Sequence, residues 1–284
     1  MQLIKPKQKG AVLLNNILSF ESNNAFKVWW LGQSGFLLKW QRKYVLFDPY
    51  LSNSLTIKYQ HTDKPHVRMS ELVIDPACLN FIDIVTSSHN HTDHLDADTL
   101  QPILKANPAI KFIIPEANRS FVANRVGCDE SFPVGLNDGT SVKLAGFTIT
   151  GVPAAHNQIE RNEKGECKCM GLVVQFENYA VYHSGDTLWF DGLDELLKPF
   201  QVDVAFLPIN GNRPERKVAG NLNPEEAALL GKSIGAGLVV PHHYHLFAFN
   251  TGDPKAFEEQ CLKHGVNNKV LEIGEGVIIA NKPN

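Results

Sequence analysis

The sequence lacks the long apolar run, the signal peptide and the basic stripe that mark membrane, secreted or nucleic-acid-binding proteins. No apolar stretch approaches the length needed to span a bilayer. The apolar run near the N-terminus is interrupted by Asn15 and Asn16, and no small-residue cleavage site follows it, so we expect no signal peptide. The formal net charge is -3 with both signs interspersed, which does not favour nucleic acid as a partner. We therefore expect a cytoplasmic protein.

Cysteine is also sparse. Five cysteines at irregular spacing suit a reducing compartment better than a secreted disulfide framework. Cys167 and Cys169 form a C-x-C pair, but no second pair accompanies them, so we interpret them as thiols entering a strand and not as a metal clip.

No repeat, low-complexity tract or linker interrupts the chain, so we expect a single domain over residues 1–284. Apolar runs at 27–32, 35–40 and 44–49 predict an antiparallel meander. The polar stretch 50–79 predicts a long loop, of a kind that is often functional.

Beyond residue 80, strands alternate with helices. The clearest helix start is Asn223, an N-cap followed by Pro224 and acids in the first turn. Segments 269–274 and 276–280 predict a closing hairpin. The order predicts an α/β protein with two sheets, each covered by helices on its outer face. Strands are expected at 82–88, 111–115, 141–154, 171–177, 179–186, 202–209 and 237–243, and helices at 96–106, 116–127, 191–200, 223–235 and 253–265.

The most informative segment lies between a predicted strand and a predicted helix, and reads His89, Asn90, His91, Thr92, Asp93, His94. In extended backbone, residues two apart point the same way, so His89 and His91 can converge on one ion. Asp93 and His94 would project from the following turn toward a neighbouring ion. Imidazole and carboxylate ligands suit Zn, Mn or Fe.

Two metal spheres require further ligands downstream. His156 follows a predicted strand, Asp186 ends the strand predicted at 179–186, and His242 and His243 end the one predicted at 237–243. The carboxyl ends of strands are where α/β folds place their sites. A lone histidine is more often structural, but three histidines and an aspartate in six residues, with such partners, are far more specific. The sequence therefore predicts a site for two divalent ions, with Asp186 able to bridge them.

This pattern, HxHxDH followed by a lone His, a GD-T and a late His, resembles that of the metallo-β-lactamase superfamily, which implies a four-layer αββα sandwich. The segments WLGQSGFLL…VLFDPYLSNS, YHSGDT (182–187) and VVPHHYHLFAFNTGDP (239–254) are similar to its branch with the UlaG-type L-ascorbate-6-phosphate lactonases and the N-acyl phosphatidylethanolamine phospholipase D relatives. The resemblance covers roughly residues 27–280.

The resemblance implies a ligand set position by position. A first ion would be held by His89, His91 and His156. A second would be held by Asp93, His94 and His243, with Asp186 bridging.

Neighbouring residues receive roles from the same resemblance. His243 matches the family ligand because it is the second residue after Pro241, which leaves His242 to support a ligand or the core. Asp48 looks like the buried acid that orients metal ligands, and a turn-capping aspartate is the equal alternative. Asn90 stands where di-iron redox relatives carry Glu, which favours hydrolysis.

We expect two divalent ions, Zn or Mn, with Fe as a further option. The carboxylates of Asp93 and Asp186 would reduce the total charge of the ions by about half. Metal binding can lower the pKa of water to about 7, so an activated hydroxide would be the nucleophile. Asp93, His91 and Asp186 are expected to serve catalysis through the ions, and Asp93 could also shuttle the proton.

Substrate contacts are expected from adjacent segments. The loop 211–217 supplies Arg213, Arg216 and Lys217, which suit phosphate, although a solvated charged loop is an equal alternative. Tyr244 and His245 flank the last ligand and could contact substrate or donate a proton.

The sequence also predicts positions for three further histidines and two tryptophans. His61 and His66 could reach over the site from the early loop, and His183 is expected in the core or behind a ligand. Trp29 and Trp30 read as packing residues.

The leading hypothesis is a hydrolase that opens a lactone or similar ester of a small molecule, such as a phosphorylated sugar. A phosphodiesterase acting on lipid or nucleotide substrates is the alternative. A nuclease is disfavoured because the interval between Asp186 and His243 holds no large insertion. The complete ligand set argues against a non-catalytic metal-binding protein. The expected partner is a small molecule, and a homo-oligomer is left open.

Overall fold

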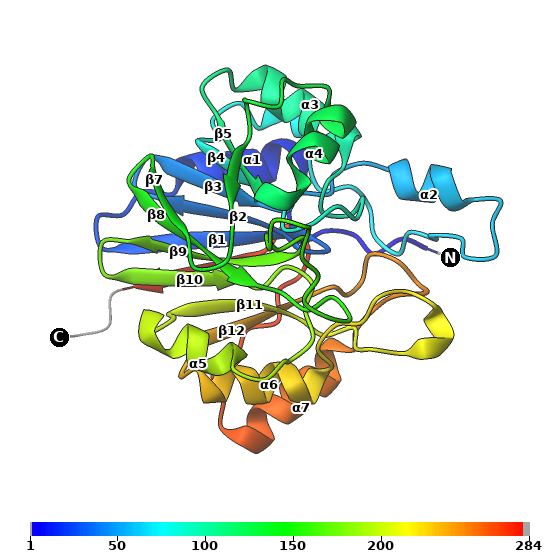
Figure 1. Cartoon of the computed structure of the whole chain (residues 1–284), viewed down its shortest axis with the longest axis vertical. Coiled ribbons are helices and arrows are strands. Elements are labelled where there is room, and N and C mark those ends of the chain that lie inside the picture. The colour runs from blue at the N-terminus through cyan, green and yellow to red at the C-terminus, as the bar shows by residue number, and fades with distance from the viewer. Residues whose placement is uncertain (1, 281–284) are drawn as a thin grey trace.

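The computed structural model describes residues 2–280 and consists of two β-sheets packed face to face (Figure 1). The strands of the first sheet are β1 Ala25–Gly32, β2 Gly35–Trp40, β3 Lys43–Phe47, β4 Ile84–Thr86, β5 Lys111–Pro115, β6 Val134–Leu136 and β13 Gly276–Ala280. Those of the second are β7 Ser141–Leu144, β8 Phe147–Pro153, β9 Met170–Phe176, β10 Tyr179–His183, β11 Val204–Pro208 and β12 Leu238–His242. Their spatial orders are β13-β1-β2-β3-β4-β5-β6 and β12-β11-β10-β9-β8-β7.

Helices cover the outer faces of both sheets. The α-helices are α1 Gly10–Ser19, α2 Ser54–Tyr59, α3 Ala97–Ala106, α4 Arg119–Val126, α5 Leu193–Leu197, α6 Pro224–Ser233 and α7 Pro254–His264. Short 3-10 turns lie at η1 Pro76–Cys78, η2 Glu116–Asn118, η3 Lys198–Phe200 and η4 Pro214–Arg216. In Figure 1, α1, α3 and α4 lie on one side of the paired sheets, and α5, α6 and α7 on the other. The predicted αββα layering is confirmed.

Aromatic side chains join the two sheets. Phe36 of β2 and Phe206 of β11 stack with ring centroids 4.0 Å apart and planes 9° from parallel, and both are fully buried. Trp29 and Trp30 are also fully buried, which confirms them as packing residues. The main core is therefore one hydrophobic cluster between and around the sheets.

Several local predictions are confirmed. The strands β1, β2 and β3 form the expected antiparallel meander. At the start of α6, the Asn223 side chain accepts from the Glu226 backbone, and the Glu226 carboxylate accepts from the Asn223 N–H, which completes a capping box.

Two predictions about connections are wrong. The expected loop 50–79 contains α2, and the expected hairpin at the C-terminus does not form. Instead β13 pairs antiparallel with β1, for example Trp29 with Gly276. A turn in which the Glu275 N–H donates to the Glu272 carbonyl directs the chain to β1. The otherwise open edge of β1 supplies a full row of hydrogen bonds, which the short preceding segment cannot.

Strand direction determines where the site forms. In the second sheet β10, β11 and β12 are parallel. Because β9 is antiparallel to both β8 and β10, β8 runs the same way as these three strands. Their carboxyl ends share one edge, and the segments that follow them carry the predicted ligands. No helix among residues 2–280 is long and apolar enough to cross a membrane.

Candidate metal centre

The histidine-rich motif lies in the turn between β4 and α3. The His91 carbonyl accepts from the backbone N–H groups of His94 and Leu95, at 3.0 and 2.8 Å. The segment therefore bends immediately after β4 and does not run as extended strand. The expectation that His89 and His91 lie in extended backbone is wrong, because residues 88–91 form a bend between β4 and that turn.

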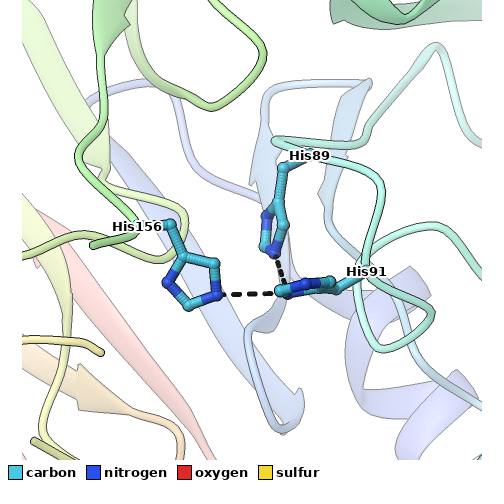
Figure 2. A group of neighbouring side chains, drawn as sticks. All are labelled: His89, His91 and His156. Carbon is cyan, nitrogen blue, oxygen red and sulfur yellow. Dashed lines mark hydrogen bonds between the residues drawn. The ribbon is translucent and has the colours of Figure 1, made fainter. Parts of the chain in front are cut away.

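Three histidines meet at one side of the centre (Figure 2). His89 Nε2 lies 3.0 Å from His91 Nδ1, and His91 Nδ1 lies 3.1 Å from His156 Nε2. His89 and His156 are buried, whereas His91 is exposed on the cavity side. Ring nitrogens this close form a natural ligand group for one ion.

A second group lies beside the first and contains Asp93, His94 and His243. His243 Nε2 is 3.5 Å from Asp93 Oδ2, and His94 Nε2 is 3.8 Å from the same oxygen. The two groups are those that the ligand assignment requires.

Asp186 lies between the two groups. Its Oδ1 is 3.2 Å from His94 Nε2, and its Oδ2 is 3.2 Å from His243 Nε2 and 3.7 Å from His156 Nε2. The side chain is buried, and among the described residues Oδ1 has no hydrogen-bond donor in good geometry. A buried carboxylate oxygen of this kind is costly unless a cation or proton satisfies it.

The donor set fits divalent ions. In these two groups, and in a third made of His89, His94 and Asp186, one ligand atom per residue lies within 4.8 Å of the others. Every donor is an imidazole nitrogen or a carboxylate oxygen. These donors suit Zn, Mn and Fe, and Asp186 supplies a donor that both ions could share.

Charge within the cluster also suits cations. Burial raises the pKa of Asp186, but His243 and His94 outweigh that effect and hold the pKa well below its usual range. Burial lowers the pKa of His89 well below normal, helped by His94 and His91. Burial lowers the pKa of His94 and of His243, but Asp186 and Asp93 outweigh it and raise the first well above normal and the second to about 9. A divalent ion would displace the protons from these two rings, because metal ligands require ionised carboxylates and neutral imidazoles.

Asp48 supports the cluster from behind. It is fully buried, its Oδ2 lies 2.7 Å from His94 Nδ1, and it accepts from the Thr86 hydroxyl at 2.7 Å and the Ser88 N–H at 3.1 Å. This geometry agrees with the orienting interpretation and not with a turn cap. The contact holds the His94 ring so that Nε2 faces Asp186.

We expect Asp48→Asn to weaken metal binding about 10- to 100-fold, the usual cost of losing such a partner. The measurement is metal content after equilibrium dialysis against graded free Zn. Asp75→Asn, at an exposed N-cap far from the cluster, is the matched control. Unchanged Zn affinity in Asp48→Asn would contradict the orienting role.

Other histidines are fixed by hydrogen bonds. His156 Nδ1 donates to the Gly220 carbonyl at 2.9 Å, which leaves Nε2 toward the cluster. His242 is not in a ligand group; its Nδ1 is 3.1 Å from Ser34 Oγ, and its ring stacks on His183 at 5.4 Å. His183 Nε2 donates to the Ser34 carbonyl at 2.8 Å. His242 and His183 thus pack behind the ligands, as expected.

Gln33 was missed by the sequence reasoning. Its side-chain Nε2 donates to Asp93 Oδ2 at 2.8 Å and lies 3.1 Å from the His243 ring nitrogens. It occupies the β1–β2 turn with φ 50°, next to Gly32. A large polar residue in a tight turn between two apolar strands is the signal that could have identified it.

A cavity of about 440 Å³ lies beside the ligands, and its walls include residues of α2, of the segment 64–66 and of the segment 217–219. Lys217 and His66 line it, in line with the predictions for them. Arg216 does not; its guanidinium donates to the Asn210 carbonyl at 2.6 Å and to Asn250 at 3.0 Å.

Three predicted substrate contacts are wrong. Tyr244 is buried, its ring stacks on Trp30, and its hydroxyl donates to the Leu271 carbonyl at 2.5 Å, so it is a packing residue. Arg213 lines a separate hollow beside the starts of α6 and α7. His245 does not line the cavity; it is half-buried, and its ring packs edge-to-face against Tyr244 at 5.1 Å. His61 is exposed and also lies outside the lining.

The comparisons with known proteins agree with this geometry. The family model described as the beta-lactamase superfamily domain matches residues 43–244, a stretch that contains every predicted ligand. A UPF0173 metal-dependent hydrolase of Rubrobacter xylanophilus is 31% identical over 194 residues, which cover 66% of this chain and 75% of that protein. Another, of Methanosarcina mazei, is 29% identical over 255 residues, covering 88% and 96%.

A solved structure shows the same fold. Igni18, a metallo hydrolase from Ignicoccus hospitalis, is 25% identical with a TM-score of 0.67, and the alignment covers 91% of this chain and 100% of that chain.

Proposed function

This chain belongs to the beta-lactamase superfamily and to the UPF0173 metal-dependent hydrolases, and we propose that the bond it hydrolyses is that of a lactone or similar ester of a small molecule. We assign a first divalent ion to His89, His91 and His156, and a second to Asp93, His94 and His243, with Asp186 shared. The observation that carries the assignment is the position of Asp186, within 3.2–3.7 Å of ring nitrogens in both groups.

Divalent ions held at this centre, Zn, Mn or Fe, would supply Lewis acidity and would lower the pKa of water toward neutrality. The residues of the chain orient the ligands and handle protons. Gln33 donates to Asp93 Oδ2 and so fixes the plane of that carboxylate. Asp93 lines the cavity and is placed to carry a proton from the attacking water toward the leaving oxygen.

Two features favour a small ester or lactone. The cavity of about 440 Å³ has the size of a small-molecule site. Three segments of the sequence also resemble the branch of the superfamily that contains the UlaG-type lactonases.

Acid release from a panel of lactones, with metal-free, Zn-loaded and Mn-loaded protein, tests this proposal. We expect activity only in loaded protein, at two ions per chain by elemental analysis. Chelation should abolish it, and adding back the metal should restore it. Protein that holds two ions but opens no lactone or ester would refute the proposal.

A further inference from the structure

The cavity carries basic side chains that the metal centre does not use. Lys58, Lys64 and Lys217 all line it, and Lys58 and Lys217 are solvent-exposed. None of the three forms an ion pair within residues 2–280, whereas seven other lysines pair with carboxylates. Their charge is therefore available to a ligand.

Lys58 is presented by α2, which replaces part of the predicted loop. Leu55, Lys58 and Tyr59 line the cavity, and their spacing of three and four residues places them on one face of the helix. Ile57, on another face, is exposed. The helix thus directs one lysine and one aromatic ring at the cavity.

Hydrogen bonds and ring contacts connect the segments that carry the other two lysines. Lys64 Nζ donates to the Lys217 carbonyl at 2.8 Å, which ties the segment after α2 to the segment after η4. The Tyr59 and His66 rings stack at 4.3 Å, and the Thr56 hydroxyl donates to the His66 carbonyl at 2.8 Å. Figure 1 shows α2 and the loop around residue 215 (yellow) at the same end of the sandwich.

The balance of charge around the cavity is one-sided. Its only carboxylates are Asp93 and Asp186, which both belong to the metal centre. The fourth basic residue, Arg125, is committed to the Asn90 carbonyl at 2.6 Å. Three ammonium groups thus line one cavity without a carboxylate partner, and an anion bound there would supply the missing negative charge. Ammonium groups bind phosphate and carboxylate as point charges.

We propose that Lys58, Lys64 and Lys217 form a subsite for an oxyanion, a phosphate or carboxylate, carried by the substrate away from the bond that is hydrolysed. The subsite rests on the proposed function, since it binds one end of a molecule whose other end is the lactone or ester. It selects acidic substrates over neutral ones of the same shape.

Three matched lactones test this subsite in the metal-loaded enzyme. Glucono-lactone is neutral, its 6-phosphate carries a phosphate at the far end, and glucaro-1,4-lactone carries a carboxylate there. We expect kcat/KM for a charged member to exceed that for glucono-lactone by roughly tenfold, mainly through KM, from two or three exposed charge contacts. The triple variant Lys58→Gln/Lys64→Gln/Lys217→Gln should lose this preference, whereas Lys232→Gln, an exposed lysine on α6, should keep it.

A binding measurement separates the subsite from the catalytic proposal. Calorimetric titration with 6-phosphogluconate, glucarate and gluconate requires no turnover. Tighter binding of 6-phosphogluconate or of glucarate than of gluconate, lost in the triple variant, supports the subsite even if no lactone is opened. Whichever of the two binds more tightly identifies phosphate or carboxylate. Equal affinities in the parent protein, or a preference that survives the triple substitution, overturn it.

Discussion

Asp186→Asn is expected to abolish hydrolysis, with a loss of about 100-fold or more, beyond the usual 10- to 100-fold cost of losing an outer partner. Asp186 is within 3.2 Å of ring nitrogens of both His94 and His243 and 3.7 Å from His156. A carboxamide has the same shape but donates two hydrogens and carries no charge. One substitution should therefore weaken both metal positions together.

Elemental analysis of the purified variant measures that coupling directly. We expect fewer than two ions per chain in Asp186→Asn at Zn concentrations that saturate the parent protein. Asp191→Asn, an exposed aspartate five residues later, should bind metal and turn over substrate normally. A variant that keeps two ions and full activity would rule out a shared ligand. Far-UV circular dichroism of both variants checks that the fold is retained.

Phe36→Ala is expected to destabilise the protein by about 3–5 kcal/mol, the range for removing a buried Phe side chain. Phe36 is fully buried, and its ring stacks on Phe206 of the opposite sheet at 4.0 Å. It also meets the His183 and His242 rings, with centroids 6.1 and 6.2 Å away. A cavity here lies between the sheets and directly behind the ligands, where the packing cannot relax easily.

Urea unfolding of metal-free protein measures this loss, because metal binding would add its own stabilisation to the folded state. The control is Phe132→Ala, whose ring is 37% exposed and which should change stability by no more than about 0.5 kcal/mol. A Phe36→Ala midpoint equal to that of Phe132→Ala would show that the inter-sheet stack does not contribute as argued. In the loaded enzyme, Phe36→Ala should also weaken metal binding.

Local patterns in the sequence determined much of the fold. Apolar runs separated by glycine and charged residues predicted the β1–β2–β3 meander, and Asn223 with Glu226 determined where α6 begins. These features depend on residues within a few positions of one another, so a linear pattern contains the information. The ligand positions after β4, β8, β10 and β12 were also readable, because strand ends in such folds lie along one edge.

Long-range contacts decided the rest, because a sequence pattern does not contain the partner of an edge or the direction of a turn. The pairing of β13 with β1 depends on an edge more than 200 residues away in the chain. Tyr244 and Arg213 were expected at the substrate, but the turn after His243 buries the first and the loop after β11 carries the second to another hollow. Gln33 and Lys58 were unremarkable until β1, α2 and the motif after β4 met around one cavity. The residue types alone thus predicted the chemistry of the centre. Only tertiary packing decided which side chains surround it, because their positions depend on distances between segments far apart in the sequence.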